Sequence, residues 1–221
     1  MKTKTMTCAL AGAALIMTSA GFAREDFTLS KLKNYKKEFK SVSIGTCSTS
    51  STKTYEDYRM ITSTDSAQYR YIHNHCEVDE ETGFLLDEAG FIGVAMGYNF
   101  GEIGSRYYIV LDTGITIPVV KVDAKAAVDA PNGCSAAADA SVIEFVIDSD
   151  RAKEYFGGSN GLASSGNFNN YTYLKGNIAD IEKVTDDPIE TGVIYTDSLQ
   201  DNDKRTETSD QIKLVEGGFN R

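Results

Sequence analysis

The sequence contains no tryptophan and only two histidines, His73 and His75, among its 221 residues. A serine or cysteine nucleophile with a histidine base would have to use one of these two, and no Gly-x-Ser-x-Gly motif is present. The glycines after residue 96 also lack the spacing of a dinucleotide-binding loop. We therefore expect neither a hydrolase with a histidine base nor a nucleotide cofactor, and no cofactor of another kind is indicated.

No apolar run approaches the roughly 20 residues needed to cross a bilayer. The first candidate, Ala9–Met17, is about half that length, follows Lys2 and Lys4, and precedes small residues that end at Ala23. This pattern predicts a secretory signal peptide over residues 1–23, with Ala20 as the alternative cleavage site. We expect a secreted, extracellular protein that is free or associated with the cell wall.

The protein has few positive charges, with a formal net charge of -10, which becomes -12 when the signal peptide removes two lysines. Such a surface repels nucleic acid and anionic lipid. We expect no nucleic-acid partner, no membrane span and a monomer.

Cysteine is also scarce, because removal of the signal peptide leaves Cys47, Cys76 and Cys134. An odd number permits at most one internal disulfide, and we expect Cys47 to pair with Cys76, with three separate thiols as the alternative. The segment His73-Asn74-His75-Cys76 contains metal-ligating residue types, but its spacing is not that of a known zinc motif and no second cluster exists. We predict no metal site.

The rest of the chain predicts one mainly β domain with extensions. Leu32, Tyr35 and Phe39 recur at helical spacing among lysines and predict a short amphipathic helix. The predicted parts are a basic leader with a Ser/Thr-rich linker at 24–53, a β domain at 54–185 and a polar, acidic extension at 186–221.

Short runs of β-branched and aromatic residues mark the expected strands. Gly114 is free to take the positive φ of a hairpin turn, and Pro118 places the second hairpin strand at an edge or bulge. The expected strands are Tyr58–Ile61, Tyr69–Ile72, Tyr107–Leu111, Ile115–Val120, Val142–Ile147 and Ile178–Val184.

Five segments in this region, in this order, carry a resemblance to a known family: Thr54–Thr62, Val94–Tyr98, Leu111–Gly114, Val122–Ala126 and Ser141–Asp148. Over about residues 54–184 the sequence resembles a largely uncharacterised family of small secreted proteins of Gram-positive bacteria. That family is in turn similar to the double-psi β-barrels of cell-wall proteins, including the three-aspartate domain of lytic enzymes and expansin-like modules.

The resemblance implies a small, six-stranded double-psi β-barrel with a groove for a glycan strand. It also implies that Asp123 is the general acid of a lytic transglycosylase, in which the sugar's own 6-hydroxyl group replaces water. That acid must be protonated, so burial or a nearby carboxylate would have to raise its pKa. Asp148 and Asp129 are the expected neighbours, and Lys125 would act in the opposite direction.

The sequence departs from the family's Gly-Asp-x-Lys-Ala-Asp pattern at Val122 and Ala127. This departure argues against catalysis. We therefore favour a cell-envelope protein that binds peptidoglycan glycan, or a wall-associated protein partner, without catalysis. The alternative is a lytic transglycosylase that cleaves peptidoglycan through Asp123. The expected glycan-binding residues are Tyr98, Phe100 and Asp129.

The predicted signal peptide can be tested directly. The mature protein should begin at Arg24, and mass spectrometry of the culture supernatant should give the corresponding mass. A cellular protein that retains Met1 would contradict the prediction.

Overall fold

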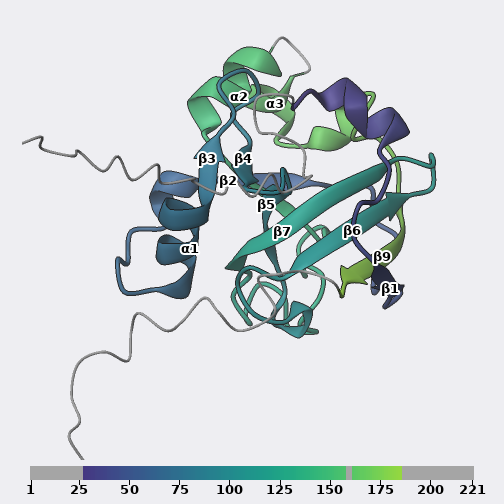
Figure 1. Ribbon diagram of the computed structural model, residues 1–221, viewed down its shortest axis with the longest axis horizontal. Helices are drawn as coiled ribbons and strands as arrows, with labels where there is room; N and C mark the ends of the chain where they lie inside the picture. Colours follow the sequence, from purple (N-terminus) through teal and green to yellow (C-terminus); the bar gives the residue numbers. More distant parts are fainter. Residues whose placement is uncertain (1–26, 158–160, 186–221) are drawn as a thin grey trace, which may run out of the picture.

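The computed structural model describes residues 27–157 and 161–185 (Figure 1). The predicted signal peptide and C-terminal extension lie outside these residues. The described chain is mainly β, as predicted. Its strands are β1 (Ser41–Ser43), β2 (Thr54–Asp57), β3 (Cys76–Val78), β4 (Leu85–Asp87), β5 (Ile92–Met96), β6 (Arg106–Leu111), β7 (Thr116–Ala124), β8 (Glu144–Ile147) and β9 (Ile178–Val184).

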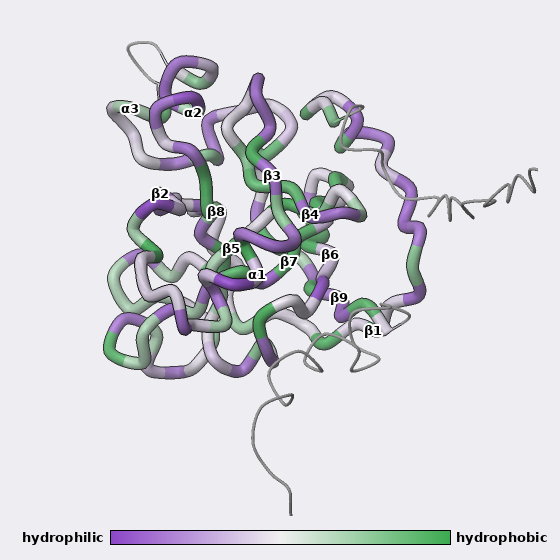
Figure 2. The backbone as a smooth tube through the Cα atoms, turned by 60° about the vertical axis from the view of Figure 1, so that its left-hand side comes forward, coloured by the Kyte–Doolittle hydropathy of each residue, from purple (hydrophilic) through white to green (hydrophobic). Residues whose placement is uncertain are grey.

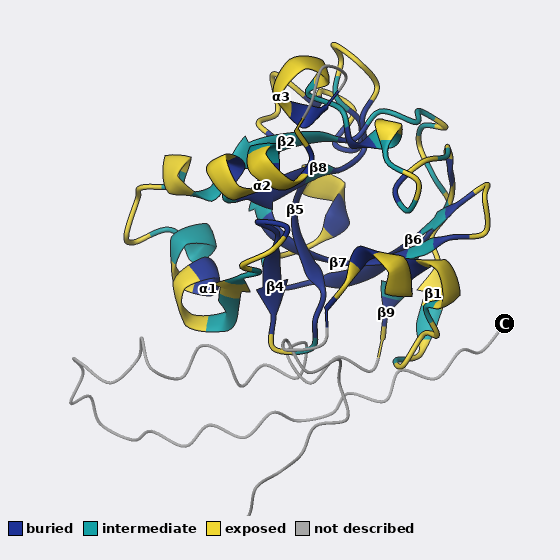
Figure 3. Ribbon diagram, turned by 90° about the horizontal axis from the view of Figure 1, so that it is seen from above, coloured by how far each residue is buried: buried dark blue, intermediate teal, exposed yellow. Residues whose placement is uncertain are grey.

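The helices are short and lie around the sheet. Figure 3 shows the buried central strands with the more exposed helices outside them. The α-helices are α1 (Ala67–His75), α2 (Ser149–Tyr155) and α3 (Leu162–Ser165), and the 3-10 helices are η2 (Leu29–Asn34), η3 (Tyr58–Met60), η4 (Tyr98–Phe100) and η5 (Phe168–Asn170).

The strands form one mixed sheet in the order β1-β9-β6-β7-β5-β4-β3, and β8 joins β2 to β5 beside this path. Two pairs are parallel, β2 with β8 and β5 with β7, and the other pairs are antiparallel. The pairings among the described strands leave the sheet open. The mainly β class is thus confirmed, whereas the predicted closure into a barrel is not.

The predicted hairpin is present as β6 and β7. Gly114 adopts φ +81° in its turn, where the N–H of Leu111 donates to the carbonyl of Ile115 at 2.8 Å. Pro118 lies opposite Tyr108 on β6, one residue before the pairing with β5 begins at Val119. Because no β5 residue pairs with Pro118, this position tolerates a residue without an N–H group.

Two predicted strands are wrong, because Tyr58–Ile61 begins with η3 and Tyr69–Ile72 lies within α1. The α1 helix begins after Ser66, whose hydroxyl accepts from the N–H of Tyr69 at 3.1 Å. Tyr69 then stacks on His73, four residues later, with 3.8 Å between the ring centroids. These i, i+4 contacts favour a helix over a strand.

The leader packs against the domain. Its predicted amphipathic helix is reduced to the six residues of η2, and the chain then runs along the side of the molecule to β1 (Figure 2). Leu32 is buried in the main core, while Tyr35 packs on Tyr108 and Phe39 on Phe91, with 5.9 and 5.8 Å between ring centroids. β1 pairs with β9. The leader and linker are therefore not separate from the core.

The disulfide joins Cys47 to Cys134 across 87 residues, with 6.3 Å between the Cα atoms. The predicted partner, Cys76, lies at the start of β3 instead. The prediction was wrong, because the fold places residues 46–50 against the loop that contains Cys134.

This disulfide should contribute substantially to stability. Closure of a loop of this length is worth about 4.6 kcal/mol on the chain-entropy model. Cys134→Ser should therefore lower the melting temperature by roughly 9–18 °C in calorimetry. Cys76→Ser is the matched control, because it removes a thiol outside the disulfide. Equal melting temperatures for the two variants would contradict the assigned pairing.

Candidate functional site

A groove of about 580 Å³ opens at one end of the sheet. Strands β2, β5, β7 and β8 form its floor, and the loop of residues 126–141, which we name the wall loop, forms one side. Five carboxyl groups and one ammonium group line it: Glu56, Asp123, Asp129, Asp139, Glu144 and Lys125.

The strand register explains why these groups meet. Ala95 on β5 lies between Glu144 on β8 and Asp123 on β7. Thr54 on β2 pairs with Glu144, and Glu56 lies two residues further along, so both face the same side of the sheet. The small side chain of Ala95 leaves space between the acids. Four strands that are distant in sequence thus converge on one carboxyl cluster.

Glu56 is the most strongly perturbed acid in the groove. Burial raises its pKa to about 8, and Asp123 adds to the rise through its charge and a side-chain hydrogen bond. Glu144 also raises this pKa, while Lys125 lowers it. Glu56 Oε1 is buried and has no hydrogen-bond partner in the described part of the chain. Burial and the neighbouring acids thus favour the protonated form of Glu56, which is the form that a general acid requires.

Asp123 is the second-to-last residue of β7 and lies in the groove, as expected from the resemblance. Its side chain is partly exposed and interacts with Glu56. No backbone N–H group of the described residues donates a hydrogen bond to the carboxyl group of Asp123. Asp123 is thus placed for contact with a ligand in the groove and does not cap a turn.

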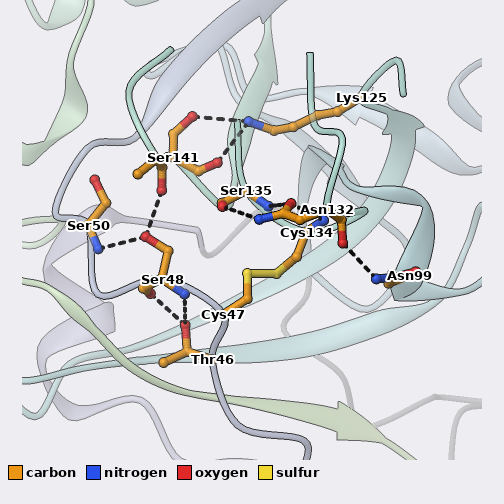
Figure 4. Close-up of a disulfide and its surroundings, with 11 residues drawn as sticks. Thr46, Cys47, Ser48, Ser50, Asn99, Lys125, Asn132, Cys134, Ser135 and Ser141 are labelled. Atoms are coloured by element: carbon orange, nitrogen blue, oxygen red, sulfur yellow. Dashed lines mark hydrogen bonds between the residues drawn. A yellow bond between two sulfur atoms is a disulfide. The ribbon is translucent and has the colours of Figure 1, made fainter. Parts of the chain in front are cut away.

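Lys125 connects the floor of the groove to the wall loop. Its ammonium group donates to the carbonyl and the hydroxyl oxygen of Ser141, at 3.3 and 3.1 Å (Figure 4). Burial lowers the pKa of Lys125, and the nearby carboxylates of Glu144 and Asp139 oppose this. The ammonium group therefore has both hydrogen-bond partners and charge partners.

The wall loop is held from outside by residues 46–50. Figure 4 shows the Cys47–Cys134 disulfide beside this contact. The hydroxyl of Ser48 donates to the carbonyl of Ala140 at 2.8 Å, and that of Ser50 to the carbonyl of Asp139 at 3.2 Å. A loop without regular secondary structure is thus fixed in place beside the carboxyl groups.

Asp148, predicted as a catalytic neighbour of Asp123, lies outside the groove. It caps the N-terminus of α2, where its carboxylate accepts from the N–H groups of Asp150 and Arg151 at 3.1 and 3.3 Å. Arg59 lies 3.8 Å from the same carboxylate. Asp148 follows the far end of β8, four residues or about 13 Å from Glu144 along an extended strand. The β8 acid in the groove is therefore Glu144.

The predicted aromatic contacts with glycan are not in the groove either. Tyr98 is 52% exposed, but its hydroxyl donates to the carbonyl of Pro131 and its ring lies outside the groove lining. Phe100 is buried edge-on against Tyr107, with 5.8 Å between ring centroids. Asp129 does line the groove. No aromatic residue is among the described lining residues, which are polar residues and small apolar residues in nearly equal number.

The histidine-rich segment has other contacts in the structure. His73 stacks on Tyr69, and His75 Nδ1 lies 2.7 Å from Glu88 Oε1. Within residues 27–157 and 161–185, no group of three or more His, Cys, Asp or Glu residues is arranged to hold a metal ion. No helix of the described chain is long and apolar enough to span a membrane.

Comparisons with family models, with curated proteins and with solved structures gave no match. The resemblance of residues 54–184 therefore stays a prediction. Of the acids that line the groove, the sequence analysis missed Glu56, Asp139 and Glu144. The alternation of Thr54 and Glu56 around Tyr55 is a signal that both polar side chains share one strand face.

The raised pKa of Glu56 predicts a specific dependence of stability on pH. Because the folded-state pKa lies above the ordinary value of 4.5, Glu56 stabilises the fold below that value and loses this contribution as pH rises to about 8. Glu56→Gln imitates the protonated acid. The variant should be slightly more stable than the wild type near pH 5, and this difference should increase up to pH 8.

Denaturant unfolding across pH 5 to 8 measures this difference. It should reach up to a few kcal/mol, since each tenfold change in proton affinity is worth about 1.4 kcal/mol. A difference between the two proteins that stays constant with pH would show that Glu56 is ionised throughout this range.

Proposed function

We propose that the groove binds a polysaccharide strand of the cell envelope and cleaves a glycosidic bond, with Glu56 as proton donor and Asp123 as proton acceptor. The observation that carries this proposal is the buried Glu56 carboxyl group, with its pKa raised to about 8, beside Asp123 in an open groove. Paired carboxyl groups in different protonation states are the usual means of glycosidic-bond cleavage.

The reaction follows from the pair. Glu56 transfers its proton to the glycosidic oxygen as the bond from that oxygen to the anomeric carbon breaks. The 6-hydroxyl oxygen of the same sugar then bonds to the anomeric carbon, and Asp123 takes the hydroxyl proton. The products are a 1,6-anhydro sugar end and a free hydroxyl end. Transfer of one proton from Asp123 to Glu56 restores the starting state.

The substrate class rests on the resemblance of residues 54–184 to cell-wall proteins, together with the predicted signal peptide. The carboxyl groups in the lining support it, because sugar hydroxyl groups can donate to the carboxylates of Asp129, Asp139 and Glu144. We also propose that the fold is related to the double-psi barrel. The support is the branched part of the sheet, where the pairing of β5 with β8 connects the parallel pair β5–β7 to the parallel pair β2–β8.

Glycan binding without catalysis is the second candidate. It is favoured by Val122 and Ala127, where the related pattern has glycine and a second acid. Under this function the carboxyl groups would only hydrogen-bond the sugar. The two candidates therefore differ in what happens when one carboxyl group is replaced by its amide.

Glu56→Gln and Asp123→Asn should each keep the fold and the binding to purified sacculi while losing release of 1,6-anhydro muropeptides. A general acid or base typically contributes a hundred- to ten-thousand-fold to the rate, so the loss should be of that order. Chromatography with mass spectrometry measures the products. Asp148→Asn is the matched control, because it makes the same chemical change at a helix cap outside the groove.

The control should keep its stability to well within about 1 kcal/mol, because asparagine caps a helix N-terminus about as well as aspartate does, and it should keep the release activity. Wild-type protein that binds sacculi and releases no fragments between pH 4 and 8 would support the binding function. Wild-type protein that neither binds nor cleaves would contradict both candidates.

A further inference from the structure

We propose that Lys125 is the positioning residue of the groove: its ammonium group fixes the end of the wall loop and sets the charge around the Glu56–Asp123 pair. This inference rests on the proposed function, because it assigns a role in the same reaction. Lys125 is not placed as a catalytic residue, since it acts through Ser141 and the neighbouring acids.

The backbone already fixes where the Lys125 side chain can go. Its N–H donates to the carbonyl of Met96 at 3.0 Å, so the pairing of β7 with β5 continues one residue beyond the strand end. Lys125 lies two residues after Asp123, and alternate residues of an extended strand face the same side. Both side chains therefore point into the groove, and both line it.

The contacts of the ammonium group serve the wall loop. Its two hydrogen bonds reach Ser141, the last residue of that loop, whose N–H group donates to the carboxylate of Asp139 at 2.9 Å. Ser141 is buried and lies three residues before Glu144, at the start of β8. One side chain on β7 thus holds the point where the loop returns to the sheet.

Lys125 is also the only cationic residue among the described residues that line the groove. The acids that act on Glu56 are Asp123 from β7 and Glu144 from β8, and Lys125 opposes them. The acids that act on Lys125 itself, from β2, β8 and the wall loop, are Glu144, Asp139, Glu56 and Asp129. The ammonium group therefore keeps the Glu56 proton transferable, because without it the surrounding carboxylates would hold that proton more tightly.

The test compares kcat/KM for fragment release against pH in the wild type, Lys125→Met and Lys125→Arg. Methionine keeps an apolar stem and removes the charge and both hydrogen bonds, whereas arginine keeps a charge and donors. For Lys125→Met we expect kcat/KM to be at least tenfold lower. We also expect the alkaline limb, the fall of kcat/KM at high pH as Glu56 loses its proton, to lie about one pH unit higher, since a neighbouring opposite charge commonly shifts a pKa by one to three units. Lys125→Arg should restore the limb.

Ser141→Ala separates the loop contact from the charge. It removes the hydroxyl acceptor and keeps the ammonium group, so it should lower the rate without moving the alkaline limb. If Lys125→Met lowers the rate and leaves the limb where the wild type has it, Lys125 is only a structural support and the proposal is overturned.

A second readout needs no activity. The free energy of unfolding of each protein is measured between pH 5 and 10 and compared with that of the same protein carrying Glu56→Gln. The pH at which this difference stops changing reports the folded-state pKa of Glu56. This pH should be about one unit higher in Lys125→Met than in the wild type. An inactive wild type with this shift would contradict the proposed function and support the role of Lys125. If this pH is the same in Lys125→Met and in the wild type, the proposed role of Lys125 is overturned, whatever the activity.

Discussion

The parallel pairing of β2 with β8 is the contact on which the groove depends. It places Thr54 opposite Glu144, and thereby carries Glu56 to the strand face that already holds Asp123. No local sequence feature could bring these acids together, because β2 and β7 are joined only through β8 and β5. A shift of one residue in this register would turn Glu56 to the opposite side of the sheet and remove the pair.

The carboxyl cluster opposes stability, and the surrounding structure offsets it. A buried carboxyl group among other acids is unfavourable when ionised, so its surroundings raise the pKa of Glu56, and the ammonium group of Lys125 lies among the remaining acids. The wall loop is held by the disulfide at Cys134 and by Ser48 and Ser50. Acids with shifted pKa values, held in place by many surrounding contacts, are typical of functional sites.

Sequence reasoning succeeded where the signal was local. The β6–β7 hairpin follows from strand patterns and a glycine turn, and β9 has the predicted bounds, Ile178–Val184. It failed where a long-range contact decides the outcome. Cys47 pairs with Cys134 because residues 46–50 pack against the wall loop. The spacing of the cysteines in the sequence does not indicate this contact.

The candidate site divides in the same way. Asp123 and Asp129 were expected in the groove and line it, but Glu56 was missed because its role depends on the β2–β8 register. Asp148 was expected beside Asp123 from the resemblance, yet it caps α2 at the far end of β8. The direct test of the account is the protonation of Glu56 in the wild-type protein. Carbon-13 NMR of its side-chain carboxyl carbon, assigned by the loss of the signal in Glu56→Gln, should give a midpoint near pH 8, and a midpoint near the ordinary value of 4.5 would contradict it.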